Sequence, residues 1–324
     1  MIRLATVGTS AITDQFLEAV QSTGRMEHTA VYSRHVDTGR AFAEKHGVSA
    51  VYTDLEQMAK SDIDAVYIAT PNRFHAAQAR VFLQNGKHVI CEKPIATSRE
   101  EYTQTKAIAD RHACVYMEAM VSCNALWAPR VRQAVREIGR IHMARLDFCQ
   151  RSSRLDAFLS GIPQNIFDMS LCAGTLMDLG VYCAYAAVDL LGMPDSITAT
   201  AQYFDNGADC SGSAVFTYSG FPAVLTYSKA GQSVAGSEII GENGTLVIDS
   251  VSQYAGARLI KDGKETVLSD SPEHFVSMQG EVIRFADFIE RKNINEYNEL
   301  SDLALQVHGC MDKIKQAAGI VYNK

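Results

Sequence analysis

The chain opens with residues 2–13, IRLATVGTSAIT, where a short apolar stretch runs through a glycine into a helical pattern. Residues 2–7 predict a buried strand, and the helix that follows carries apolar residues on one face: Ile12, Phe16, Ala19 and Val20. Gly8 lies at the turn between them, which is the context of a dinucleotide-binding turn. A plain strand-to-helix turn with Ser10 as N-cap explains the same residues without a ligand.

The pattern of strand followed by helix continues to about residue 120. Further strands are predicted at 29–33, 65–69, 89–91 and 114–118. Asp54 and Ser98 are the expected N-caps of two of the intervening helices. Strands that alternate with helices indicate a doubly wound parallel sheet, so residues 1–120 predict an α/β dinucleotide-binding domain of Rossmann type.

The remaining residues, 121–324, predict a second α/β domain with a different sheet. Four turn signals separate short strands over 196–268, at 205–207, 219–220, 242–244 and 261–263, and imply an open, mostly antiparallel sheet. The other expected elements are a helix at 125–138, a strand at 141–152, an irregular segment at 153–173, a helix at 176–191, and closing helices near 274–292 and 301–318. The final helix is expected to pack back on the first domain.

Composition excludes several classes of function. With 324 residues and a net charge of −7, the chain lacks the basic footprint of a nucleic-acid-binding protein. No uninterrupted apolar run approaches the length of a membrane span, and the N-terminus has no signal-peptide pattern. The eight cysteines form no C-x-x-C motif and the nine histidines no metal-binding spacing. We therefore expect a cytoplasmic protein with reduced thiols, no metal and no membrane or nucleic-acid partner.

The glycine turn and the end of the second strand suggest how a cofactor would be held. The turn residues expected to line the pyrophosphate are Gly8, Thr9, Ser10, Ala11 and Ile12. The second strand ends in Ser33-Arg34 and has no acid before Asp37. An acid at this place would favour NAD, whereas a hydroxyl and an arginine can bind a 2′-phosphate. NADP(H) is therefore favoured, with NAD(H) possible, unless Arg34 is simply a solvated loop residue.

Two further stretches carry groups suited to proton transfer. Glu92-Lys93-Pro94 follows the strand at 89–91, at the edge where open α/β sheets bind ligands. Asp178 and Tyr182 stand four residues apart and share one face of the predicted helix. A lysine stabilises oxyanion charge and lowers the pKa of a nearby phenol. Each residue alone also has a structural explanation: a surface lysine, an aspartate at a helix N-terminus and a half-buried tyrosine.

Together these motifs resemble the glucose–fructose oxidoreductase, inositol dehydrogenase and rhizopine-catabolism family (Gfo/Idh/MocA). The resemblance rests on the glycine turn, residues 70–75 and 86–94, and residues 174–182, and it extends over essentially the whole chain. It implies catalytic roles for Lys93, Asp178 and Tyr182. It also implies cofactor contacts from Thr70, Pro71, Asn72, His75, Glu92 and Lys93. Ser10 departs from a family glycine, and Tyr182 replaces the histidine of many members, as in the dihydrodiol and pentose dehydrogenase-like branch.

The resemblance implies hydride transfer between a nicotinamide and a CH–OH group of a sugar, polyol or cyclic diol. Tyr182 would exchange the hydroxyl proton, Lys93 would support it and Asp178 would orient the substrate. Two alternatives remain open: NAD-dependent glycoside cleavage on the same fold, and a dinucleotide-sensing regulatory protein without chemistry. The open sheet has a second face that helices do not cover, so the chain is expected to form at least a homodimer through it.

Overall fold

Gly8 determines how the first strand meets the first helix. Strand β1 (Ile2–Val7) ends at Gly8, and α1 (Ala11–Thr23) begins after the N-cap Ser10. Gly8 has φ 117°, and a Cβ there would lie 2.7 Å from the carbonyl oxygen of Ala69. Any side chain would therefore clash with the backbone of Ala69 at the end of the neighbouring strand, so the turn requires glycine.

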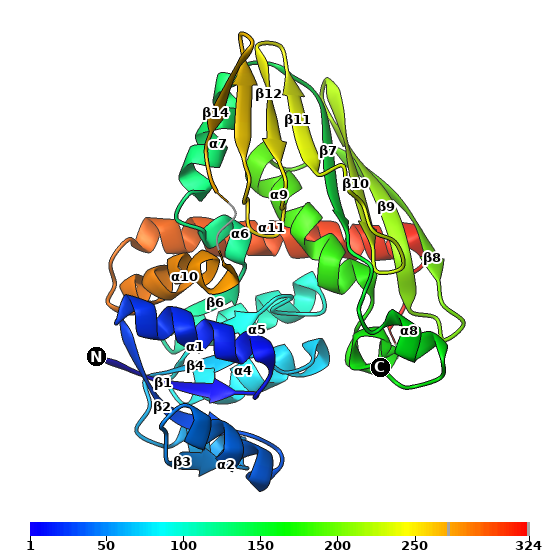
Figure 1. Cartoon of the computed structure of the whole chain (residues 1–324). Coiled ribbons are helices and arrows are strands. Elements are labelled where there is room, and N and C mark those ends of the chain that lie inside the picture. The colour runs from blue at the N-terminus through cyan, green and yellow to red at the C-terminus, as the bar shows by residue number, and fades with distance from the viewer. Residues whose placement is uncertain (271–272, 323–324) are drawn as a thin grey trace. The chain divides into compact units, whose positions relative to one another are not determined.

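The first sheet has six parallel strands in the order β3-β2-β1-β4-β5-β6 (Figure 1). This order confirms the predicted Rossmann fold. The remaining strands are β2 (Met26–Tyr32), β3 (Ala50–Tyr52), β4 (Ala65–Ile68), β5 (His88–Glu92) and β6 (Tyr116–Ala119). The helices are α2 (Val36–Lys45), α3 (Leu55–Ala59), η1 (Asn72–Phe74), α4 (His75–Gln84) and α5 (Arg99–Arg111).

The second sheet has eight strands in the order β14-β13-β12-β11-β7-β10-β9-β8. Every pair is antiparallel except β7 with β10, and all four predicted turns lie between successive strands, which confirms an open, mostly antiparallel sheet. The strands are β7 (Ile141–Cys149), β8 (Ser196–Tyr203), β9 (Asp209–Tyr218), β10 (Phe221–Ser228), β11 (Ser237–Gly241), β12 (Gly244–Ile248), β13 (Arg258–Lys261) and β14 (Lys264–Val267).

Side chains on this sheet alternate between a buried and an open face. Ala144 and Leu146 of β7 are buried toward α9 (Val181–Leu191), and Ala223 and Leu225 of β10 follow the same pattern. Their neighbours in sequence point to the opposite face. The alternation shows why one face carries helices while the other stays open.

Three predicted elements differ in the structure. The expected helix at 125–138 corresponds to α7 (Ala128–Glu137), which begins later because Pro129 lacks an N–H and favours a helix start there, and a separate short helix, α6 (Val121–Asn124), precedes it. The helix at 176–191 begins as a π-helical turn, η4 (Leu176–Gly180), before α9. The irregular segment contains α8 (Leu155–Leu159) and the 3₁₀ turns η2 (Asn165–Phe167) and η3 (Met169–Leu171).

The computed structural model describes residues 1–270 and 273–322 and divides into two units. The first comprises Met1–Met120 and Glu273–Asp302, and the second comprises Val121–Pro272 and Leu303–Lys324. Within the first, α10 (His274–Ile289) packs on α1, and Arg25 pairs with Asp287 at 2.8 Å. Helix α11 (Ile294–Ala318) contributes residues to both units.

One stretch of the second unit is apolar enough to resemble a membrane span. Met169–Leu191 meets the length and composition of a span, although it contains Asp178 and Asp189 and is therefore not an uninterrupted apolar run. However, 83% of its most apolar window is buried inside the folded chain. The stretch is therefore the core segment on which the second sheet packs.

Candidate active site

The predicted cofactor residues of the first unit follow strands that end at the same edge. Gly8 to Ile12 follow β1, Ser33 and Arg34 follow β2, Thr70 to Asn72 follow β4, Glu92 ends β5 and Lys93 follows it. In a parallel sheet these carboxyl ends converge, and ligands bind in the crevice outside them. The structure thus brings this whole set together within the first unit.

The N-terminus of α1 fits a bound pyrophosphate. Ser10 is the N-cap, but its side chain accepts no hydrogen bond from the first turn. Its Oγ lies 3.3 Å from Thr13 Oγ1. The first N–H groups therefore point out of the helix without a side-chain cap, and the helix dipole favours an anion there. The serine that replaces a family glycine does not block this end.

The end of β2 offers a hydroxyl and a guanidinium. Ser33 is buried, with Oγ 3.4 Å from the backbone nitrogen of His35, whereas Arg34 is exposed. Among residues 1–270 and 273–322, no carboxylate forms a salt bridge with Arg34. A guanidinium in this state is available to a phosphate group.

His75 connects two loops at this edge of the sheet, the one after β4 and the one after β5. Its Nδ1 lies 2.8 Å from the carbonyl oxygen of Pro94, and its Nε2 lies 2.6 Å from that of Thr70. The ring is buried, and burial lowers the pKa of His75. A neutral imidazole has one N–H, so it donates to one carbonyl at a time. In this structure His75 holds the loops that carry Thr70 and Lys93.

Glu92 and Glu118 support the backbone on either side of Lys93. Glu92 is buried and accepts a hydrogen bond from Tyr67 Oη at 2.6 Å; burial raises the pKa of Glu92, opposed by this hydrogen bond and by Lys93. Glu118 is also buried and accepts from the backbone nitrogen of Ile95 at 3.1 Å. Glu92 Oε2 also accepts from the backbone nitrogen of Lys93 at 3.3 Å, so the two carboxyl groups hold the backbone at Lys93 and Ile95.

Asp178 and Tyr182 lie in consecutive turns of the second unit. Asp178 belongs to η4, and its side chain is 39% exposed. Tyr182 lies in the first turn of α9, where its ring meets Phe148 of β7 edge-on at a centroid distance of 5.5 Å. The sheet therefore backs the phenol while the carboxylate reaches solvent from the same helical segment.

The sequence interpretation missed Lys229, which contacts Asp178. Lys229 Nζ lies 2.7 Å from Asp178 Oδ2, and its side chain is only 3% exposed. Position 229 has the same parity as the buried residues 223, 225 and 227 of β10 and is buried like them, as is Ser228. That parity was the available signal, because it places a lysine on the buried face.

Asp209 holds the π-helical turn at its other end. Its Oδ2 accepts from the backbone nitrogen of Leu176 at 2.6 Å, and its carbonyl accepts from Thr175 Oγ1 at 2.8 Å. Gly174 has φ 148°, and a Cβ there would lie 2.0 Å from Asp209 Oδ1. Burial raises the pKa of Asp209, opposed by the Leu176 N–H and by Lys229. A π-turn at such a place is a common feature of functional sites.

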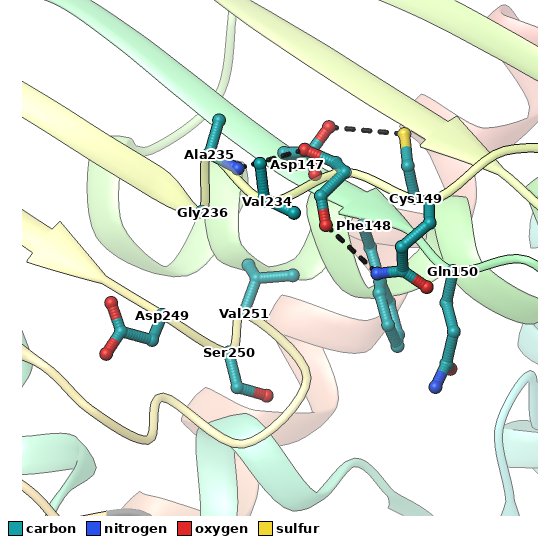
Figure 2. Close-up of a pocket in the computed structure, with 12 residues that line it drawn as sticks. Asp147, Phe148, Cys149, Gln150, Val234, Ala235, Gly236, Asp249, Ser250 and Val251 are labelled. Atoms are coloured by element: carbon teal, nitrogen blue, oxygen red, sulfur yellow. Dashed lines mark hydrogen bonds between the residues drawn. The ribbon is translucent and has the colours of Figure 1, made fainter.

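A cavity of about 280 Å³ lies at the carboxyl end of β7, beside Phe148. Figure 2 shows the loop at 249–251 opposite the strand end that carries Asp147 and Phe148. Most polar groups that line the cavity are carboxyl, amide or hydroxyl groups, and no lysine, arginine or histidine is among the lining residues. These residues are Asp147, Phe148, Cys149, Gln150, Gln232, Ser233, Val234, Ala235, Gly236, Asp249, Ser250 and Val251. Such a lining suits a neutral molecule with several hydroxyl groups.

Comparison with protein families assigns both parts of the chain. Residues 2–120 match the model described as "Oxidoreductase family, NAD-binding Rossmann fold" (GFO_IDH_MocA), and residues 130–247 match the "GFO/IDH/MocA C-terminal domain".

Curated relatives extend over nearly the full length. The scyllo-inositol 2-dehydrogenase (NADP(+)) of Bacillus subtilis is 37% identical, with 99% of this chain and 98% of that protein covered. The trans-1,2-dihydrobenzene-1,2-diol dehydrogenase of Danio rerio is 26% identical over 97% and 96%. A solved 3-ketoreductase from Actinomadura kijaniata, in complex with NADP and TDP-benzene, superposes with a TM-score of 0.83 at 24% identity and 98% coverage of each chain. That structure supports the fold.

Proposed function

The chain belongs to the Gfo/Idh/MocA family of oxidoreductases, and from this premise we propose that it is an NADP(H)-dependent dehydrogenase of a polyol. The reaction is oxidation of a CH–OH group to a carbonyl with loss of a hydride and a proton, or its reverse. The observation that carries the proposal is the polar cavity without basic residues beside Phe148, whose ring contacts Tyr182, in a chain this similar to an NADP(+) polyol dehydrogenase.

The cofactor would be held by the carboxyl edge of the first sheet. The uncapped N–H groups of α1 suit the pyrophosphate, and Arg34 with Ser33 suits the 2′-phosphate. The remaining proposed contacts come from Thr9, Ala11, Ile12 and the loop at 70–72. His75 and Glu92 support the backbone of the loops that carry these contacts and Lys93. When bound, the nicotinamide supplies the hydride acceptor or donor.

Three side chains are proposed to act on the reacting hydroxyl. Tyr182 takes its proton during oxidation and returns it during reduction. Lys93 favours the ionised phenol and the developing alkoxide by its positive charge. Asp178 accepts a hydrogen bond from the substrate and so orients it. The edge-on contact with Phe148 packs one side of the phenol ring against the sheet.

The substrate is proposed to be neutral, compact and rich in hydroxyl groups. The cavity volume of about 280 Å³ suits a single sugar or cyclitol ring. Asp147, Gln150, Gln232 and Asp249 offer acceptors for hydroxyl donors. A phosphorylated sugar would face Asp147 and Asp249 with no cation in the lining itself, since Arg258 lies behind it and is already paired with Asp249 at 2.7 Å, and this disfavours a phosphate.

A screen of polyols and sugars with NADP⁺ and NAD⁺ tests the function. We expect scyllo-inositol or another neutral polyol to reduce NADP⁺, followed by absorbance of the reduced nicotinamide, and sugar phosphates to react far more slowly. Cleavage of a glycoside without net reduction of the cofactor would instead support the glycosidase alternative. Tight cofactor binding with no reaction of any kind would support the sensor.

We further propose a homodimer through the open face of the second sheet. Met143, Ile260 and Val267 point to that face and are 38%, 39% and 52% exposed. Light scattering at micromolar concentration should give at least twice the mass of the 35.5 kDa chain, and Met143→Lys should shift it toward the monomer. Val321→Lys, at an exposed apolar residue outside the sheet, is the control. A fully active wild-type monomer would exclude this interface.

The proposed location is the cytoplasm. All eight cysteines are free thiols in the structure, and seven of them are buried. A reducing compartment keeps thiols in this state.

A further inference from the structure

Lys229 is a buried cation whose position is set by the sheet. Its backbone nitrogen donates to the carbonyl of Cys210 at 3.0 Å, and its carbonyl accepts from the nitrogen of Ser152 at 2.9 Å. Both neighbouring strands thus hold its backbone one residue beyond β10. The side chain continues the inward face of that strand and is 3% exposed. Because the backbone is held and the side chain is buried, the ammonium group can occupy few other positions.

The ammonium of Lys229 is close enough for its charge to act on the Asp209 carboxylate, and it contacts groups of η2 and η4. It lies 2.7 Å from Asp178 Oδ2, 3.3 Å from the carbonyl oxygen of Ile166, and 5.4 Å from the ring centroid of Phe167. The last two belong to η2, in the irregular segment before the π-turn. Lys229 therefore ties η2 to η4 and holds the Asp178 carboxylate from its buried side.

The arrangement is poorly explained by stability alone. Removing an ammonium from water costs several kcal/mol, and a hydrocarbon of the same length would fill the space without that cost. What the hydrocarbon cannot do is orient a carboxylate. Asp178 needs such orientation, because it is 39% exposed and lies in a π-turn rather than in a regular α-helix.

We propose that Lys229 is a positioning residue for the dehydrogenase reaction, which holds Asp178 as an oriented anion that accepts a hydrogen bond from a substrate hydroxyl. This inference rests on the proposed function and adds a residue to it. In this role Asp178 is an acceptor and does not deliver a proton. The same contact couples the conformation of η2 to the carboxylate, so the irregular segment influences substrate binding through Lys229.

The ion pair itself is tested by thermal unfolding, independently of activity. Asp178→Asn removes the carboxylate that pairs with the buried ammonium and should lower Tm by roughly 5 °C or more. Adding Lys229→Met to Asp178→Asn should restore most of that loss. If the double variant is no more stable than Asp178→Asn, the two side chains are not coupled and the proposal fails.

Kinetics then separate a positioning role from a purely structural one. With scyllo-inositol or the best polyol of the screen, Lys229→Met and Asp178→Asn should each lower kcat/KM roughly 100-fold, and the double variant should be no worse than either. The affinity for NADPH should stay within about twofold of wild type. The double variant also protects the test, because it can be compared with Asp178→Asn even if Lys229→Met alone is unstable.

Two results would overturn the role. The first is a fall in kcat/KM of the double variant equal to the product of the falls in the two single variants. The second is a wild-type kcat/KM in Lys229→Met. The matched control is Lys87→Met, because Lys87 Nζ bonds the carbonyls of Ser61 and Ile63 at 3.0 and 2.8 Å and should affect Tm without changing KM. A wild-type protein that oxidises no polyol refutes the proposed function, while the Tm comparison still decides whether Lys229 and Asp178 are coupled.

Discussion

Replacing Arg34 by alanine should change the choice of cofactor more than the strength of cofactor binding in general. Arg34 follows β2 immediately after Ser33, is exposed, and has no salt-bridge partner among the residues that the structure describes. A phosphate oxygen is the partner that this guanidinium lacks. NADPH carries that phosphate on its ribose and NADH does not. Arg34→Ala should therefore weaken NADPH and leave NADH nearly unchanged.

The expected size of the effect follows from the exposure of Arg34. A hydrogen bond to a charged group contributes about 1.5–3 kcal/mol, which corresponds to roughly 10–150-fold in Kd. Because the arginine is solvent-accessible, screening by water and salt places the effect near the lower end, at roughly 10–30-fold. Raising the ionic strength to about 1 M should shrink the difference between wild type and variant.

Titration of NADPH and NADH against each protein, followed by nucleotide fluorescence, measures the ratio directly. Arg111→Ala removes an equivalent exposed charge from the end of α5 and should alter neither affinity. If Arg34→Ala weakens both cofactors equally, Arg34 does not read the phosphate. If it weakens neither, the phosphate is bound elsewhere.

Tyr182→Phe or Lys93→Ala should lower kcat by roughly 10²–10⁴-fold with little change in NADPH affinity, and near-normal turnover in both would refute their catalytic role. Burial lowers the pKa of His28 to about 4, so the unfolded chain binds a proton more readily and stability should fall as pH drops from about 6.5 to 4. The loss is up to about 3 kcal/mol, and urea unfolding of His28→Gln should show a weaker pH dependence in that window than wild type. Glu281 is fully buried with both oxygens unpartnered among the described residues, and burial strongly raises its pKa. Glu281→Met should therefore raise Tm, and a lower Tm would indicate that the carboxyl group has a stabilising partner.

Local signals predicted the framework well because they depend on neighbouring residues. Asp54 caps α3 by accepting from Glu56 and Gln57 at 2.8 and 3.1 Å, as its position before the helix indicated. In the capping box at Ser98, the Ser98 hydroxyl accepts from the nitrogen of Glu101 as expected. The Glu101 carboxylate, however, accepts from the nitrogen of Thr97, one residue before the N-cap. Such one-residue shifts depend on how the preceding loop is held.

The parts of the site that were missed depend on contacts between distant segments. Lys229 and Asp178 are far apart in sequence, and their pairing follows from the packing of η4 against β10. The π-turn at η4 follows from the carboxylate of Asp209, which binds the nitrogen of Leu176 from another strand. Motif spacing indicated which residues carry the chemistry, but it contains no information on the side chains that hold them.

The single parallel pair in the second sheet has a consequence for how this protein can diversify. Strands β8 to β10 form one meander on one side of β7, and β11 to β14 form another on its other side. The segment at 229–236 is the connection that crosses from one meander to the other, over the carboxyl end of β7. Each meander keeps its own ladder of hydrogen bonds whatever the length of this crossing, so insertions beyond Lys229 should leave the scaffold intact. Residues 232–236 also form part of the cavity wall. Mutational exploration of this crossing is therefore an economical route to new substrate preferences, with little penalty to folding.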